Sequence, residues 1–139
     1  VSDTLIKDIQ STFNAGFASE NEVNETIKTH FDKFNYLCDT HTAVAVKVYD
    51  NYVAETNDDI PTVIDSTASP YKFSKSVLSA VQDGKAPEFD EFEMVDKLYE
   101  VTNAAVPAPL ANLKNKKIRF NNVCDKKNMS EMVFKLLDL

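Results

Sequence analysis

The first part of the chain carries apolar residues at helical spacing. Apolar positions from Leu5 to Phe13 recur every three or four residues, and either Ser2 or Asp3 is placed to cap the start of a helix. Gly16 follows at the distance expected for a residue just beyond a helix end. The pattern therefore predicts a short amphipathic helix that Gly16 closes.

A second helix is predicted from a capping-box pattern. Ser19 is followed three residues later by Glu22, so each side chain can bond to the backbone N–H of the other residue. An apolar stripe then runs from Val23 to Phe34 with the period of a helix. These two signals predict a helix that begins directly after Ser19.

The stretch "CDTHTAVAVKVYDNYVAET" carries two competing patterns. Three valines alternate with other residues, as in a strand, whereas apolar positions between Ala45 and Val53 also fit one face of a helix. An N-cap at Asp39 or Thr40, together with a length beyond a dozen residues, favours the helix. We predict a helix here.

An apolar strand and a hydroxyl-rich elbow come next. Thr62–Ile64 form the one convincing buried strand. The elbow "STASPYKF", Ser66–Phe73, then leads into a helix that runs to Val81. The hydroxyls of Ser66–Ser69 either cap that helix or face a ligand, because ligands of open α/β sheets lie beyond the carboxyl ends of the strands. Spacing alone leaves both alternatives open.

The rest of the chain is predicted to be mostly helical. We expect a surface loop over residues 83–90, an amphipathic helix over Phe92–Tyr99 and a short apolar connector at "VPAPL". A further strand is expected around Ile118–Phe120. Asn128 and Glu131 form a capping-box variant before a last apolar helix.

A single clear strand among about five helices predicts an α/β fold that is incomplete by itself. A lone strand leaves both of its edges unpaired, and buried backbone groups without partners are costly. We therefore expect the strand at Thr62–Ile64 to join a sheet that another segment of a larger protein supplies.

Composition narrows the classes of function. A formal net charge of −7 over 139 residues disfavours nucleic-acid binding, which needs a basic face. No apolar stretch approaches the roughly 20 residues of a membrane span. Two cysteines far apart in sequence, Cys38 and Cys124, do not indicate a disulfide framework, so we expect a reducing, cytoplasmic setting. The dense basic cluster is expected to be a solvated edge, and it consists of Lys114, Lys116, Lys117 and Arg119.

Glycine usage and the ligand-type residues limit the chemistry further. There are two glycines, where an average chain of this length has about ten, so a phosphate-cradling loop is not expected. Cys38 and His41 have a metal-like spacing, but zinc needs a second pair of ligands and Cys124 stands alone. Ser69 and His41 with an acid supply the residue types of a hydrolytic triad, yet no G-x-S-x-G elbow accompanies them.

Three blocks of the sequence occur together: "DTHTAVAVKVYDNYVAET", "TVIDSTASPYKFSKSVLSAV" and "VCDKKNMSEMVFKLL". The middle block is the most specific, because Thr67–Phe73 read Thr-Ala-Ser-Pro-Tyr-Lys-Phe. This resembles the threonine synthase family, whose motif is close to Thr-Ala-(His/Ser)-Pro-x-Lys-Phe. The similarity is to the C-terminal part of that family and runs from about residue 15 to the end of the chain.

The resemblance implies a helix-rich C-terminal segment, residues 1–139, of a pyridoxal-phosphate-dependent enzyme with the tryptophan-synthase-β-like fold (fold type II). Such an enzyme is a carbon–oxygen lyase of threonine biosynthesis, which converts O-phosphohomoserine and water to L-threonine and phosphate. The motif match implies that Thr67 hydrogen-bonds the pyridine nitrogen of the cofactor. A neutral partner there suits β,γ-elimination and replacement better than transamination. Lys72 either faces the anionic substrate or is a surface lysine.

The resemblance also identifies what these residues lack. The Schiff-base lysine and the glycine-rich phosphate loop of the family belong to an N-terminal portion without a counterpart here, and Lys72 does not match the covalent position. We expect a fragment with no catalytic residue and no activity of its own, which binds the rest of the parent chain or self-associates. The alternative is a free-standing helical interaction module, derived from the enzyme, without catalysis. His41 is expected only to pack at a helix start.

Overall fold

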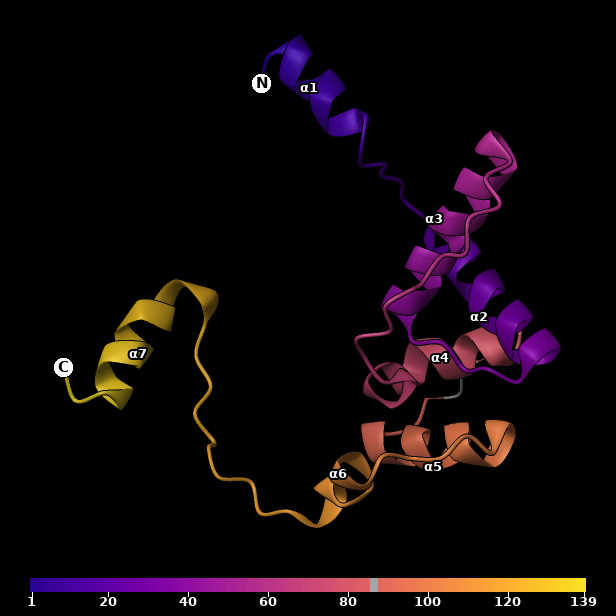
Figure 1. Ribbon diagram of the computed structural model, residues 1–139. Helices are drawn as coiled ribbons and strands as arrows, with labels where there is room; N and C mark the ends of the chain where they lie inside the picture. Colours follow the sequence, from indigo (N-terminus) through magenta and orange to yellow (C-terminus); the bar gives the residue numbers. More distant parts are fainter. Residues whose placement is uncertain (86–87) are drawn as a thin grey trace.

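The structure is a computed structural model that describes residues 1–85 and 88–139 (Figure 1). Its described residues form helices and extended connections. The helices are α1 (Asp3–Gln10), α2 (Glu20–Phe34), α3 (Thr40–Thr56), α4 (Ser74–Val81), α5 (Glu91–Thr102), α6 (Ala108–Ala111) and α7 (Met129–Leu136), with short 3₁₀ helices η1 (Pro70–Phe73), η2 (Leu113–Asn115) and η3 (Lys126–Asn128).

Helices α2, α3, α4 and α5 enclose the hydrophobic core. Helix α2 packs against both α3 and α4, and α4 packs on its other side against α5 (Figure 1). Ile27, Leu78 and Leu98, one from each of α2, α4 and α5, have no exposed surface. The other members of the core are Val23, Cys38, Ala43, Tyr71, Val77 and Ala80. The core is therefore helix against helix, as expected where amphipathic faces have no sheet to cover.

The predicted caps at the starts of the first three helices are confirmed. The Ser19 backbone N–H donates to Glu22 Oε2 at 2.8 Å, and the Glu22 N–H donates to Ser19 Oγ at 3.4 Å, which completes the capping box of α2. Ser2 caps α1, and Asp39 caps α3. The ambiguous valine-rich stretch is a helix of 17 residues, as predicted. Local capping chemistry thus fixes where each of these helices begins.

Asparagine ends three of the helices. Asn35, Asn57 and Asn103 follow α2, α3 and α5 with φ of 51°, 56° and 53°, which is the left-handed conformation. Glycine is the usual residue at such a position, and asparagine tolerates it better than other non-glycine residues do. Asparagine therefore occupies the position that glycine usually takes at the ends of these three helices.

The two predicted strands are not present in the described residues. Residues 61–67 and 117–125 carry no helix and no strand. Val63 is 88% exposed and Ile118 is 71% exposed, so neither segment lies in a core. An extended segment becomes a strand only when a second segment offers a hydrogen-bonding ladder, and the described residues offer none. The described residues are helix-rich, as expected, and contain no strand, so the pairing of Thr62–Ile64 with a sheet of a larger protein stays a prediction.

Two expected helix boundaries are also wrong. Helix α1 ends at Gln10, well before Gly16. A Cβ atom on Gly16 would lie 2.9 Å from Val48 Cγ1, so this glycine allows the chain to approach α3 closely. Asn128 precedes α7 without a side-chain capping bond, because its φ of −104° and ψ of 11° continue the 3₁₀ turn η3. The loop expected over residues 83–90 includes residues 86–87, which lie outside the described residues.

Helices α1 and α7 lie away from the core and expose apolar side chains. Figure 1 shows both helices separated from α2–α5 by extended segments. Neither helix has a buried residue. The exposed apolar residues are Leu5, Ile6 and Ile9 on α1 and Met129, Val133, Phe134 and Leu136 on α7. Contiguous apolar surface of this kind is typical of an interaction face.

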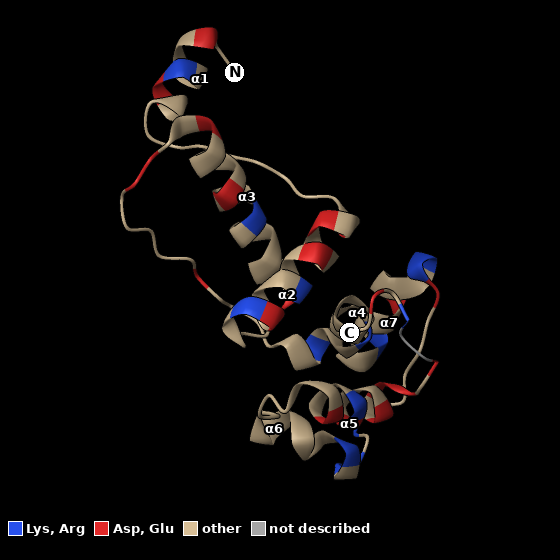
Figure 2. Ribbon diagram, turned by 90° about the vertical axis from the view of Figure 1, so that its right-hand side faces the viewer, with Lys and Arg blue, Asp and Glu red and all other residues tan. Residues whose placement is uncertain are grey.

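Charged residues of both signs alternate over the helices. Figure 2 shows acidic and basic positions interspersed along α2, α3 and α5, without a separate basic face on these helices. Lys28 pairs with Asp32 at 3.5 Å and with Asp83 at 3.4 Å. Among the described residues, no helix is both long enough and apolar enough to cross a membrane.

The helix-on-helix core makes a direct prediction about stability. Replacing Leu98, which is fully buried, with alanine leaves a cavity and should lower the free energy of unfolding by about 2–5 kcal/mol. Leu137→Ala is the matched control, because Leu137 is 62% exposed and its truncation should change stability by less than ~0.5 kcal/mol. Urea denaturation of the two variants tests this. Equal losses would contradict the core assignment.

Candidate functional site

A buried carboxylate lies at the start of α3. Asp39 is only 1% exposed. Its Oδ1 accepts the backbone N–H of His41 at 2.9 Å and that of Thr42 at 3.3 Å, and its Oδ2 accepts the Thr42 hydroxyl. A buried charge is costly unless hydrogen bonds replace its hydration, and the positive end of the helix dipole favours an anion here. The cap therefore satisfies the carboxylate and the first turn of α3 together.

The pKa of Asp39 reflects this environment. Burial by itself raises the pKa, whereas the hydrogen bonds from the Thr42 hydroxyl and from the two backbone N–H groups, followed by the nearby His41 ring, lower it. The net pKa lies below the ordinary value for an aspartate. Asp39 is therefore a carboxylate at neutral pH and acts only as a hydrogen-bond acceptor.

The start of α3 contacts both ends of the elbow, through a hydrogen bond at one end and an aromatic ring at the other. The Thr42 and Ser66 hydroxyl oxygens are 3.0 Å apart, across 24 positions of sequence. At the other end, the His41 ring packs on the Phe73 ring with 4.9 Å between centroids. His41 has the expected packing role, and the elbow is held to α3 at its first and last residues.

The elbow is also anchored in its second half. Ser69 Oγ accepts the Tyr71 N–H at 3.3 Å and caps η1. Tyr71 is 4% exposed, and its hydroxyl donates to the Ala104 carbonyl beyond α5. Ser74 donates to the Tyr71 carbonyl at 2.9 Å. The capping alternative for the elbow hydroxyls is therefore realised at Ser69, although the capped element is η1 and not α4.

Thr67 and Lys72, the two predicted site residues, are both exposed. None of the described residues hydrogen-bonds the Thr67 side chain. Lys72 lines a pocket of 510 Å³ with Phe73 from η1 and Phe92 from α5, and Thr67 is not part of its lining. The structure thus leaves the predicted roles of both residues as predictions.

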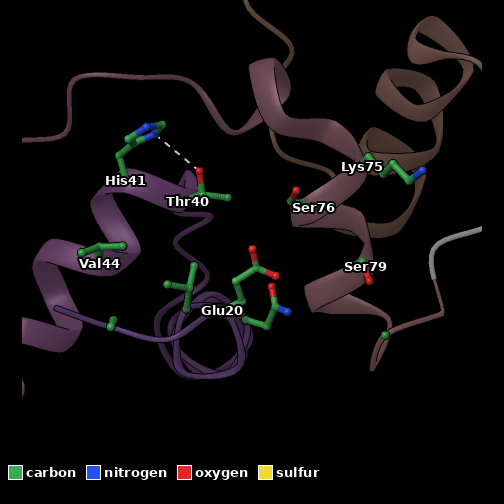
Figure 3. A pocket seen from close by; sticks show the side chains of 11 residues that line it. Glu20, Thr40, His41, Val44, Lys75, Ser76 and Ser79 are labelled. Carbon is green, nitrogen blue, oxygen red and sulfur yellow. Dashed lines mark hydrogen bonds between the residues drawn. The ribbon is translucent and has the colours of Figure 1, made fainter.

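A pocket lined by both polar and apolar residues opens beside the starts of α2 and α3. Its volume is 710 Å³, and Figure 3 shows Thr40 and His41 of α3 on one side with Lys75, Ser76 and Ser79 of α4 opposite them. The Thr40 hydroxyl lies 3.4 Å from His41 Nδ1. No described serine hydrogen-bonds His41, so the pocket lacks the paired nucleophile and base of a hydrolase.

The chemistry of Cys38 gives no support to a metal or thiol site. Its side chain is 1% exposed, and burial, followed by the nearby charge of Asp39, raises the pKa of the thiol to about 11. The thiolate is the form that binds metals and attacks substrates, and it is scarce at neutral pH at such a pKa. Within residues 1–85 and 88–139, no three His, Cys, Asp or Glu side chains are grouped as metal ligands.

A sequence model of the family described as "Threonine synthase, C-terminal" matches residues 42–133. The chain belongs to the threonine synthase family. The matched region begins at Thr42, contains the whole elbow, and continues through α4 and α5 into α7. The hydrogen bond between Thr42 and Ser66 therefore lies entirely within the threonine synthase region, and its acidic partner Asp39 lies three positions before that region.

Curated relatives carry the same family name. Threonine synthase-like 1 of Homo sapiens is 32% identical over 82 residues, which are 59% of this chain and 11% of that protein. Threonine synthase of Saccharomyces cerevisiae is 28% identical over 107 residues, which are 73% of this chain and 21% of that protein. The match thus spans between about a tenth and a fifth of the length of these relatives.

The hydrogen bond between Thr42 and Ser66 has no signal in the sequence that would predict it. Asp39 was recognisable as a cap, because an acidic residue preceded a long apolar pattern. Thr42 stands where a side chain can return to the cap, so a local signal existed for two of the three linked residues, Asp39 and Thr42. Ser66 is 24 positions away, and only the packing of the folded chain brings it to Thr42.

The lowered pKa of Asp39 predicts a pH dependence of stability. A carboxyl whose folded pKa is depressed stabilises the fold above its unfolded pKa of about 3.9, and this contribution is lost as the pH falls through the folded value. Asparagine caps helices equally well but does not ionise. We expect the free energy of unfolding of Asp39→Asn to fall less than that of the wild type between pH 7 and pH 3.

Urea denaturation at several pH values measures this difference. Asp50→Asn is the matched control, because Asp50 is an exposed aspartate on the same helix. Its acid dependence should follow the wild type. If the free energy of unfolding of Asp39→Asn and of the wild type fell equally with pH, the ionisation of Asp39 would make no contribution to stability.

Proposed function

We propose that this chain is the C-terminal part of a pyridoxal-phosphate-dependent threonine synthase, which converts O-phosphohomoserine and water to L-threonine and phosphate. The observation that carries the proposal is the elbow, because Thr67–Phe73 follow the family motif inside the matched region. The 139 residues contain no glycine-rich phosphate loop, so we expect no activity from them alone.

The chemistry of Thr67 fits one contact of the cofactor. Its hydroxyl is exposed and has no hydrogen-bond partner among the described residues. A hydroxyl is a neutral donor and acceptor, which is what a pyridine nitrogen needs from a single partner. When bound, pyridoxal phosphate would supply the electron-accepting ring for elimination and replacement at carbon. The part of Thr67 would be to hold one neutral hydrogen bond at the ring nitrogen.

Lys72 would bind the phosphate of the substrate. Lys72 lies on η1, five residues after Thr67, and it lines the 510 Å³ pocket between η1 and α5. A lysine ammonium is a flexible point charge that serves well as a phosphate ligand. Thr67 does not line this pocket, so the two contacts would be made from two separate parts of the elbow.

The exposed apolar faces of α1 and α7 support packing against the rest of a parent chain. The extended segment Thr62–Ile64, in which Thr62 and Val63 are exposed, is suited to add a strand to a larger sheet, as the fold-type-II architecture of the proposed enzyme would require. Both cysteines are free thiols, which supports a reducing compartment such as the cytoplasm.

One observation favours the alternative, a helical interaction module without catalysis. The core formed by α2, α3, α4 and α5 is built from residues of this chain alone, and Ile27, Leu78 and Leu98 are fully buried in it without a partner. A full-length protein that fails to bind pyridoxal phosphate would favour this alternative. Saturable binding of the cofactor would favour the enzyme.

Replacing the Thr67 hydroxyl tests the proposed function. In the full-length protein that contains this chain, Thr67→Val should shift the absorption band of bound pyridoxal phosphate, because the ring nitrogen loses its partner. It should also lower kcat about tenfold, which corresponds to roughly 1.4 kcal/mol of transition-state stabilisation. Absorption spectroscopy and phosphate release from O-phosphohomoserine give the two readouts.

Thr62→Val is the matched control for this experiment. Thr62 lies in the same extended segment and is exposed, and among the described residues its hydroxyl bonds only to the nearby Ile60 carbonyl, at 3.1 Å. It should keep the spectrum and the rate of the wild type. An unchanged spectrum and rate in Thr67→Val would rule out the assigned contact.

A further inference from the structure

Asp39, Thr42 and Ser66 are linked through the Thr42 hydroxyl. The Asp39 carboxylate accepts and cannot donate, and the Thr42 hydroxyl donates to Asp39 Oδ2. The same hydroxyl donates to Ser66 Oγ, 3.0 Å away. The Thr42 hydroxyl is therefore shared between the two oxygens, and it bridges the buried carboxylate and Ser66.

This chain of bonds starts from a rigid base. Asp39 is 1% exposed, and on either side of it Cys38 is 1% exposed and Ala43 is fully buried in the core. Thr42 itself is 4% exposed. Ser66, by contrast, is exposed. These hydrogen bonds therefore hold Ser66, a residue at the surface, in a fixed position relative to the core.

Two residues separate this anchor from the next one. Ser69 caps η1, and η1 is held in the core by Tyr71, which bonds to the Ala104 carbonyl. Between Ser66 and Ser69 lie only Thr67 and Ala68. A two-residue span between fixed ends has little freedom, so the direction of the Thr67 side chain depends on where Ser66 is held.

We propose that Asp39, Thr42 and Ser66 form a hydrogen-bond relay that positions Thr67 for its contact with the cofactor ring, an inference that rests on the proposed function. The three are positioning residues, and none of them is assigned a contact with the cofactor. The relay links a charge buried in the helical core to the orientation of one exposed hydroxyl. Displacing a side chain in the site by about 1 Å can lower the rate of the catalysed reaction about a hundredfold, so the position of Thr67 would affect catalysis.

The test uses the full-length protein with two variants that break the relay. Thr42→Val preserves the shape of the side chain but removes the hydroxyl, and Ser66→Ala removes the last link at an exposed position where folding should be unaffected. Both should shift the absorption band of bound pyridoxal phosphate in the same direction as Thr67→Val. Both should lower kcat between about tenfold and a hundredfold with little change in KM.

Two further variants separate positioning from loss of stability. Thr42→Ser keeps the hydroxyl and should restore the wild-type spectrum. Thr26→Val is the matched control, because Thr26 is also buried, at 7% exposure, and its hydroxyl donates to the Glu22 carbonyl away from the elbow. It should reduce stability as Thr42→Val does and yet leave the spectrum unchanged.

The outcomes distinguish the relay from the proposed function. A shifted spectrum in Thr67→Val with wild-type spectra in Thr42→Val and Ser66→Ala would overturn the relay and leave the function intact. No change in Thr67→Val would overturn both. A shift in Thr26→Val equal to that in Thr42→Val would also overturn the relay, because general loosening of the core would then explain the effect.

Discussion

The buried cap at the start of α3 is the interaction on which the arrangement of the candidate site depends. Asp39 is ionised and nearly inaccessible, so the backbone N–H groups of the first turn and the Thr42 hydroxyl must remain bonded to it. That requirement fixes Thr42, and Thr42 in turn holds Ser66 at the beginning of the elbow. A single buried charge thereby sets the starting point of α3 and the position of a segment more than twenty residues away.

The core and the outer helices have different physical roles. Helices α2–α5 bury Ile27, Leu78 and Leu98 completely and form a closed helical unit. Helices α1 and α7 have clear amphipathic patterns but bury nothing within the described residues. A chain that belongs to the threonine synthase family and matches only a small part of its curated relatives is expected to present such faces to the rest of a larger protein.

Sequence patterns predicted what local chemistry decides. Ser19 with Glu22 marked the start of α2, and Asp39 marked the start of α3, because capping involves residues three or four positions apart. Whether Thr62–Ile64 forms a strand could not be decided in this way, because an extended apolar run becomes a strand only when a second segment pairs with it, and the structure shows no strand there. The close approach of Gly16 to Val48 and the hydrogen bond between Thr42 and Ser66 could not be predicted from the sequence either, because both depend on contacts across the fold.

The coupling energy between Thr42 and Ser66 is the most direct test of whether the buried cap holds the elbow. Urea denaturation of Thr42→Val, Ser66→Ala and the double variant gives a double-mutant cycle, which isolates the interaction between the two hydroxyls. If the cap holds the elbow as described, the losses of stability should be non-additive by about 1 kcal/mol. Losses that add to within about 0.3 kcal/mol would show that the two hydroxyls are independent and that Asp39 does not control the elbow.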